Sequence, residues 1–266
     1  MNHKFKLSWF LLATLFVASY FGIDALSAIA AGKKPAAPGS GTTVAATTPA
    51  EAAPAGTAAI SGKVSLSGAA PAAEKIKMGA DPVCMQQHSD AVMKQEIVAN
   101  NGMLQYVLVY VKDGIQGSYP APAEAVTISQ KGCMYEPHVF GIQVGQKLEI
   151  ANSDSTLHNI NCQAAKNKKF NLAQPTKGMK TTKIFDQAEV GVPFKCNVHP
   201  WMTAFAGVFN HPFFAVTDAN GTFQIKGLPA GTYTIEAWQE KLGTQSQTVT
   251  VADGETKTVD LSFAAK

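Results

Sequence analysis

Four side chains in two short segments of the sequence offer the donor atoms of a metal site. Cys196, His199 and Met202 follow one another at intervals of three residues. A trigonal copper site takes one thiolate, two imidazoles and a weakly bound thioether, so this segment carries three of the four ligands. The second imidazole must come from elsewhere in the fold, and His158 is the candidate. We therefore predict one copper ion bound by His158, Cys196, His199 and Met202.

The apolar pattern around the cysteine predicts strands that would position three of these ligands. Apolar residues at alternate positions from 190 to 194 lead up to Cys196, so its sulfur is expected to face inward. The apolar run 204–209 predicts a returning strand. His199 and Met202 would then lie on the short loop between the two strands.

Several of these segments resemble the cupredoxin family over residues 137–209. Residues 144–154 read Val-Gly-Gln-Lys-Leu-Glu-Ile-Ala-Asn-Ser-Asp and predict the hairpin strand that leads to the pair His158-Asn159. The Cys-x2-His-x2-Met loop, with Pro200 after its histidine, is similar to that of amicyanin/plastocyanin-like members. The resemblance implies a Greek-key β-sandwich, a single type 1 copper and a one-electron carrier. It also implies that Asn159, beside the first ligand, ties its loop to the cysteine loop.

Other metals and activities are weighed against this interpretation. Zinc could take the Cys2His2 set His158, Cys162, Cys196 and His199, but this would leave Met202 unexplained. A binuclear copper centre needs two cysteines in one loop, whereas the predicted ligand loop contains only Cys196. The chain has no His-x-His motif for an oxygen- or nitrite-reacting copper and no Cys-x-x-Cys-His haem site. We predict an electron carrier rather than an enzyme; the alternative is a non-redox surface or copper-binding module with a structural zinc or copper.

The remaining cysteines are interpreted with Cys196 taken as a ligand. Cys84 and Cys133 lie outside the ligand loops, and we predict that they form a disulfide. Cys162 is then a leftover thiol, either a small buried hydrophobe, an oxidisable group or a dimer bridge. His88 and His138 follow the two paired cysteines closely, and a surface or core role is favoured over a second metal site.

A group of lysines lies between the two ligand segments. No acidic residue separates its members, which are Lys166, Lys168, Lys169, Lys177, Lys180 and Lys183. A solvated loop is one interpretation. The sharper one is a docking face, formed by Lys166, Lys168 and Lys169 with Trp201, that steers an acidic redox partner to an exposed edge of His199.

The N-terminal region predicts export. Lys4 and Lys6 precede a short apolar run, and a small-residue site follows it, so residues 1–30 are expected to be a signal peptide or an N-terminal anchor. Residues 31–59, mostly Ala, Pro, Gly and Thr, are expected to be a disordered linker. The folded part would be periplasmic or otherwise extracytoplasmic, in contact with a membrane only if the segment is uncleaved. All 22 basic residues are lysine, which argues against nucleic-acid binding.

The rest of the chain predicts an all-β protein with a second, smaller sandwich. Alternating strands separated by turns fill residues 213–263, whose motifs resemble carboxypeptidase-regulatory-like, transthyretin-like domains. The predicted division is a copper domain at 60–210 and this sandwich at 211–266. The segment Ile-Ser-Gly-Lys-Val at 60–64 resembles the first strand of such a sandwich, so an inserted copper unit is the alternative. One short helix is expected within 84–98.

Overall fold

The computed structural model describes residues 56–265. The predicted signal peptide and most of the predicted linker lie outside this range. The described part of the chain holds nineteen strands and one five-residue helix, which confirms the all-β prediction. Within that part, no helix is long and apolar enough to cross a membrane.

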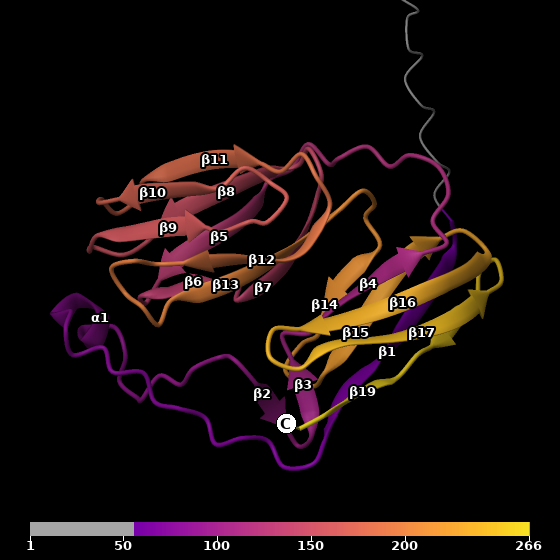
Figure 1. Ribbon diagram of the computed structural model, residues 1–266, viewed down its shortest axis with the longest axis horizontal. Helices are drawn as coiled ribbons and strands as arrows, with labels where there is room; N and C mark the ends of the chain where they lie inside the picture. The colour runs from indigo at the N-terminus through magenta and orange to yellow at the C-terminus, as the bar shows by residue number, and fades with distance from the viewer. Residues whose placement is uncertain (1–55, 266) are drawn as a thin grey trace, which may run out of the picture. The chain divides into compact units, whose positions relative to one another are not determined.

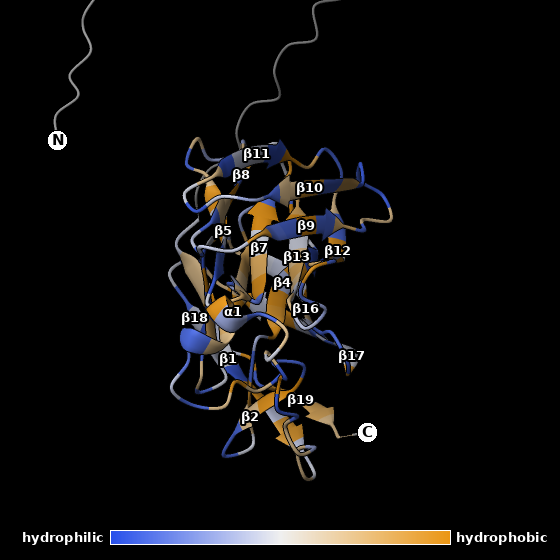
Figure 2. Ribbon diagram, turned by 90° about the vertical axis from the view of Figure 1, so that its left-hand side faces the viewer, coloured by the Kyte–Doolittle hydropathy of each residue, from blue (hydrophilic) through white to orange (hydrophobic). Residues whose placement is uncertain are grey.

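Two sheets pack into a β-sandwich that carries the predicted ligands, called here the metal-site sandwich (Figure 1). The strands of its first sheet are, in spatial order, β10 (Phe170–Gln174), β9 (His158–Cys162), β12 (Glu189–Lys195), β13 (Thr203–Phe209) and β7 (Val139–Gln143). Those of its second sheet are β11 (Lys180–Ile184), β8 (Lys147–Asn152), β5 (Val126–Lys131) and β6 (Met134–Glu136). In β8, Leu148 and Ile150 are buried while Lys147 is exposed, because successive side chains point to opposite faces. Figure 2 shows that β7, which is largely buried, is mostly apolar, whereas the exposed edge strand β11 is mostly polar.

The other two sheets form a second sandwich, called here the C-terminal sandwich. Its larger sheet contains β15 (Thr222–Leu228), β1 (Ala58–Ser67), β3 (Met103–Gln105), β2 (Val98–Asn100), β18 (Thr256–Thr258) and β19 (Leu261–Ala264). Its smaller sheet contains β14 (Phe214–Val216), β4 (Leu108–Asp113), β16 (Gly231–Gln239) and β17 (Gly243–Val251).

The predicted boundary at residue 210 is not a boundary between sheets. Strand β1 pairs antiparallel with β15, so that Ile60 lies opposite Ile225. Strand β4 likewise pairs with β16. The metal-site sandwich is therefore inserted between β4 and β14, as the alternative interpretation had it. Alternation identified these strands, but it shows which face of a strand is buried and not which strand is its neighbour.

The connection from β1 to β2 crosses to the metal-site sandwich and forms a cap, defined here as residues 75–93. An isolated bridge between Lys75 and Met93 closes its base. The cap contains α1 (Pro82–Gln86), which begins earlier than the short helix expected within 84–98. Asp81 and Pro82 explain the early start, because an Asp at the N-cap and a proline in the first turn both favour a helix N-terminus.

Candidate metal centre

His158 is the first residue of β9 and is completely buried. A tight turn after β8 places His158 at this position. The Asn152 side chain accepts a hydrogen bond from the Asp154 backbone amide at 2.9 Å and donates one to the Thr156 carbonyl at 3.0 Å. These bonds fix the polar loop before β9, as Asx turns do.

Cys196, His199 and Met202 lie on the loop that joins β12 to β13. The backbone amide of Cys196 donates to the Met202 carbonyl at 3.1 Å, and that of Met202 donates to the His199 carbonyl at 2.9 Å. The His199 amide also donates to the Cys196 sulfur at 3.4 Å. This tight, internally bonded loop holds all three residues at one end of the sandwich.

The predicted ligands come together in the folded chain. Nδ1 of His158 lies 3.0 Å from Nδ1 of His199, and the latter lies 3.9 Å from Sγ of Cys196. One ligand atom from each of the three residues lies within 4.8 Å of the other two. Metal bonds of ~2.0–2.3 Å could meet at a point between them. All three residues are buried, as is Met202, so the fold brings the thiol and both imidazoles together, and their binding of a metal stays a prediction.

Asn159 links the two ligand segments, as the resemblance implied. Its Oδ1 accepts a hydrogen bond from the Asn197 backbone amide at 2.6 Å and lies 3.4 Å from Sγ of Cys196. The same amide oxygen therefore holds the cysteine loop against β9.

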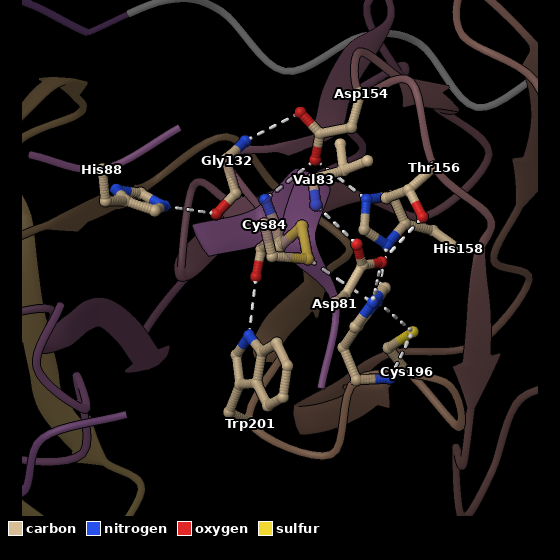
Figure 3. The surroundings of a disulfide bond; sticks show 12 residues. Asp81, Val83, Cys84, His88, Gly132, Asp154, Thr156, His158, Cys196 and Trp201 are labelled. Atoms are coloured by element: carbon tan, nitrogen blue, oxygen red, sulfur yellow. Dashed lines mark hydrogen bonds and ion pairs between the residues drawn. A yellow bond between two sulfur atoms is a disulfide. The ribbon is translucent and has the colours of Figure 1, made fainter. Parts of the chain in front are cut away.

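Two carboxylates orient the imidazoles, and sequence reasoning missed both of them (Figure 3). Asp154 Oδ2 lies 2.8 Å from His158 Nε2, and Asp81 Oδ2 lies 3.0 Å from His199 Nε2. Asp154 also accepts from the backbone amides of Gly132 and Cys133. Such carboxylate–histidine pairs leave Nδ1 of each ring free to face a metal. The position of Asp154, four residues before His158, was the signal available in the sequence.

These contacts shift the pKa values of the groups that would bind the metal. Burial alone would lower the pKa of His158, but Asp154 and Cys196 raise it to about 9. Burial lowers the pKa of His199 against the opposing effect of Asp81. Burial alone would raise the pKa of Cys196, but hydrogen bonds from His158 and neighbouring amides lower it. The site therefore favours the thiolate, which is the form that binds metals.

The donor set fits copper better than zinc. One sulfur and two imidazole nitrogens converge, and a buried thioether side chain shares the loop of Cys196 and His199. Among the described residues, Cys162 belongs to no group of converging metal-binding side chains, so the Cys2His2 set does not form. The reason is its place at the far end of β9, four residues from His158 and about 13 Å along a strand.

The predicted disulfide is confirmed. Cys84 in α1 is bonded to Cys133, and their α-carbons are 5.4 Å apart. His88 and His138 have protein partners instead of belonging to a metal site. His88 Nε2 lies 2.7 Å from the Gly132 carbonyl oxygen, and His138 Nε2 lies 2.6 Å from a Glu240 carboxylate oxygen.

The expectation of an exposed edge on His199 is wrong. This residue is only 2% exposed, because the cap covers it. Sγ of Cys84 lies 3.5 Å from its Nε2, on the side where Asp81 also binds. Trp201, whose ring centre is 5.1 Å from that of His199, donates its indole N–H to the Cys133 carbonyl at 3.0 Å.

The lysines predicted to border the metal lie at the opposite end of the sandwich. The backbone amide of Lys166 donates to the carboxylate of Glu189 at 3.0 Å. Glu189 begins β12 whereas Cys196 follows its end, a separation of about 20 Å along an extended strand. Lys168 and Lys169 share this exposed loop. Lys180 is nearer the centre, because it pairs with Ala151 where β8 leads towards Asp154.

A comparison with protein families agrees with the carboxypeptidase-regulatory-like resemblance. Residues 207–264 match the family model described as a carboxypeptidase regulatory-like domain. A copper-containing nitrite reductase from Thermus scotoductus SA-01 is 21% identical, with a TM-score of 0.30 over 38% of this chain and 25% of that one. A purple cupredoxin from Nitrosopumilus maritimus is 24% identical, with a TM-score of 0.27 over 31% of this chain and 98% of that one.

A structure of amicyanin in a reduced mutant form is 22% identical, with a TM-score of 0.29 over 32% of this chain and 81% of that one. The chain thus spans about a quarter of the length of the nitrite reductase and most of the length of the two cupredoxins. No curated protein matches the chain. The assignment of a metal and a function therefore rests on the geometry of the centre.

Proposed function

We propose that this chain is an exported one-electron carrier that holds a single type 1 copper ion and is not an enzyme. His158, Cys196 and His199 would bind the copper, and Met202 would supply a weaker thioether donor. The observation that carries the proposal is the convergence of one thiol and two imidazoles, each with one ligand atom within 4.8 Å of the others, in a buried site. Copper supplies the chemistry, which is exchange of one electron between two oxidation states.

The surroundings of the ligands suit electron transfer. The Asn159 amide and two carboxylates hold the cysteine loop and both imidazole rings in place. A rigid ligand set changes little between oxidation states, which keeps the barrier to electron transfer low. An enclosed centre also suits this role, because an electron can pass without a substrate reaching the metal.

The redox partner is proposed to be a protein met outside the cytoplasm. Lys166, Lys168 and Lys169 lie too far from the centre to steer such a partner to it. Lys177 and Lys180 are better placed to attract an acidic partner, because the Gly178 amide between them donates to the Asn152 carbonyl at the metal end of β8. Trp201 remains a predicted contact.

The experiment is Cu(II) loading of the full chain, followed by visible and paramagnetic-resonance spectroscopy. The wild-type protein should be intensely coloured through charge transfer from the Cys196 thiolate, and Cys196→Ser should lose this absorption completely. Cys162→Ser is the matched control and should keep it, because Cys162 lies outside the metal-binding group. A colourless protein that binds one zinc tightly would support the non-redox alternative and end the proposal.

A further inference from the structure

The cap is packed against the metal-site sandwich and covalently linked to it. The Ile76 amide donates to the Val92 carbonyl at 2.8 Å beside the bridge at the base of the cap. Ile76, Met78 and Cys84 belong to the hydrophobic core that also contains Cys196 and Met202. The disulfide joins the tip of the cap to Cys133. The cap is therefore fixed over the centre at its base, its middle and its tip.

Asp81 is the residue of the cap that contacts a predicted ligand through its carboxylate. Its Oδ1 accepts a hydrogen bond from the Val83 amide at 2.8 Å and so caps the N-terminus of α1. Its Oδ2 accepts from the Thr156 hydroxyl at 2.8 Å and from His199 Nε2 at 3.0 Å. One side chain thus joins the cap, the loop before His158 and the ring of His199. Figure 3 shows Asp81 between Val83 and Thr156.

We propose that Asp81 is a positioning residue of the metal centre, which fixes the ring of His199 for metal binding through Nδ1 and closes the outer edge of that ring. This inference rests on the proposed function and adds to it a residue that lies 118 positions from the ligand it orients. Together with Asp154 it gives the centre two carboxylate–imidazole pairs.

The chemistry of the carboxylate determines the tautomer of His199. An ionised carboxylate can only accept hydrogen bonds, so the contact requires a proton on Nε2. The neutral ring then carries its lone pair on Nδ1, which faces Nδ1 of His158 and Sγ of Cys196. The other neighbour of Nε2 is Sγ of Cys84 at 3.5 Å, which accepts hydrogen bonds more weakly than a carboxylate, so Asp81 is the stronger determinant of this tautomer.

Closure of the ring edge follows from the same contact. Asp81, Cys84 and Trp201 surround the outer side of His199 and leave it 2% exposed. A redox partner therefore meets the cap and not the ligand.

The first test uses the metal-free full chain with its disulfide intact. Asp81→Asn keeps the size of the side chain but replaces one acceptor oxygen with an NH2 donor. If the amide oxygen of the variant still accepts the hydrogen bond from Val83, its NH2 group faces Nε2 of His199. Nε2 must then accept a hydrogen bond, so the proton of the neutral His199 ring moves to Nδ1. Nitrogen NMR of histidine-labelled protein should show His199 protonated on Nε2 in the wild type and on Nδ1 in the variant.

The second test is copper affinity, measured by competition with a chelator. Asp81→Ser keeps an N-cap acceptor for α1 but is too short to reach His199. Copper binding should weaken roughly 10- to 100-fold, the usual effect of losing a residue that orients a metal ligand. Asp90→Ser is the matched control, because Asp90 is an exposed residue of the same cap, and its affinity should match the wild type.

The outcomes separate this inference from the proposed function. Unchanged affinity in Asp81→Ser together with an unchanged tautomer in Asp81→Asn would reduce Asp81 to a helix cap and overturn the inference. A wild-type chain without the thiolate absorption would instead end the copper proposal, and the NMR result would still decide whether Asp81 sets the tautomer. If Asp81→Ser fails to fold, Asp81→Asn supports both measurements.

Discussion

At the scale of single residues, the two free cysteines differ in reactivity because their surroundings differ. Both are buried. Burial raises the pKa of the Cys162 thiol to about 11, and the nearby Glu189 carboxylate adds to this effect. The pKa of Cys196 is lowered by hydrogen bonds that outweigh its burial. Cys196 is therefore the thiol that ionises more readily, and Cys162 behaves as a small hydrophobic side chain.

We expect iodoacetamide to modify Cys196 well before Cys162 in the metal-free protein. At pH 8 a thiol with a pKa near 11 is ionised in roughly one molecule in a thousand, and only the thiolate reacts. Mass spectrometry of peptides from a time course would measure both rates. Copper should protect Cys196 and leave the rate at Cys162 unchanged. Faster labelling of Cys162 would contradict the structure around β9.

The sequence predicted the residues that converge at the centre, and Asn159 beside them, but not the carboxylates that contact the two imidazoles. Cys196, His199 and Met202 are close together in the chain, so their spacing alone indicates a site. Asp81 contacts His199 although the two residues are 118 positions apart in the sequence, and no local sequence pattern predicts such a contact. For the same reason the sequence suggested an open edge on His199, whereas the fold brings the cap over it.

At the scale of elements, one carboxylate anchors the loop between β9 and β10. Glu189, at the start of β12, accepts from the backbone amides of Ala165, Lys166 and Asn167. These donors would otherwise be buried without partners or exposed to water. Burial alone would raise the pKa of Glu189, but these hydrogen bonds lower it below the usual value.

Glu189→Gln should lower the free energy of unfolding by about 1–3 kcal/mol at pH 7, because a neutral amide replaces a charged acceptor. A carboxyl whose pKa is lower in the folded state binds fewer protons there. The contribution of Glu189 to the free energy of unfolding is therefore complete above the pKa of the unfolded state, ~4.3. It is lost as the pH falls through the lower pKa of the folded state.

Urea unfolding at pH 7 and at pH 3 would measure the difference between the wild type and this variant. The difference should shrink at the lower pH. Glu124→Gln, at an exposed position, is the control and should match the wild type at both values. An equal difference at both pH values would show that the charge of Glu189 is not the cause.

Two of the strands that the sequence did not predict are edge strands. β10 and β11 each lie at the end of a sheet and so have one strand neighbour. In β11, whose sequence is Lys-Thr-Thr-Lys-Ile, no residue is fully buried. Exposed, lysine-bearing edges protect a sheet from unwanted pairing, but they weaken the apolar alternation by which a strand is recognised.

At the scale of the whole molecule, the two sandwiches are joined by close packing as well as by the chain. A hydrophobic cluster contains Val139 and Phe209 of the metal-site sandwich and Leu108 and Tyr110 of the C-terminal sandwich. Because β1 to β4 precede the inserted sandwich and β14 to β19 follow it, the C-terminal sandwich forms only after the whole insertion has been synthesised. Long-range pairing of this kind makes folding slow, and it also links the stability of the two parts.

Gly141 tests this linkage, because it lies on β7 where the metal-site sandwich meets Phe214 of β14. A Cβ atom added at Gly141 would lie 2.2 Å from the Phe214 ring, so the ring or the strand would have to move. Overpacking of this kind usually costs about 1–3 kcal/mol, and we expect Gly141→Ala to lower the free energy of unfolding by that amount. Gly79→Ala is the matched control, since a Cβ there meets no atom within 4 Å and the change should stay within about 0.5 kcal/mol.

The same variant reports on cooperativity. In the wild type, urea should remove the copper absorption and the far-ultraviolet circular dichroism in one transition, because the packed contact makes the two sandwiches unfold together. In Gly141→Ala the weakened contact should separate the two curves, with the copper absorption lost at a different urea concentration from the bulk of the β signal. Coincident curves and unchanged stability in the variant would mean that the sandwiches are coupled by their shared strand connections alone, and that the Phe214 contact adds nothing.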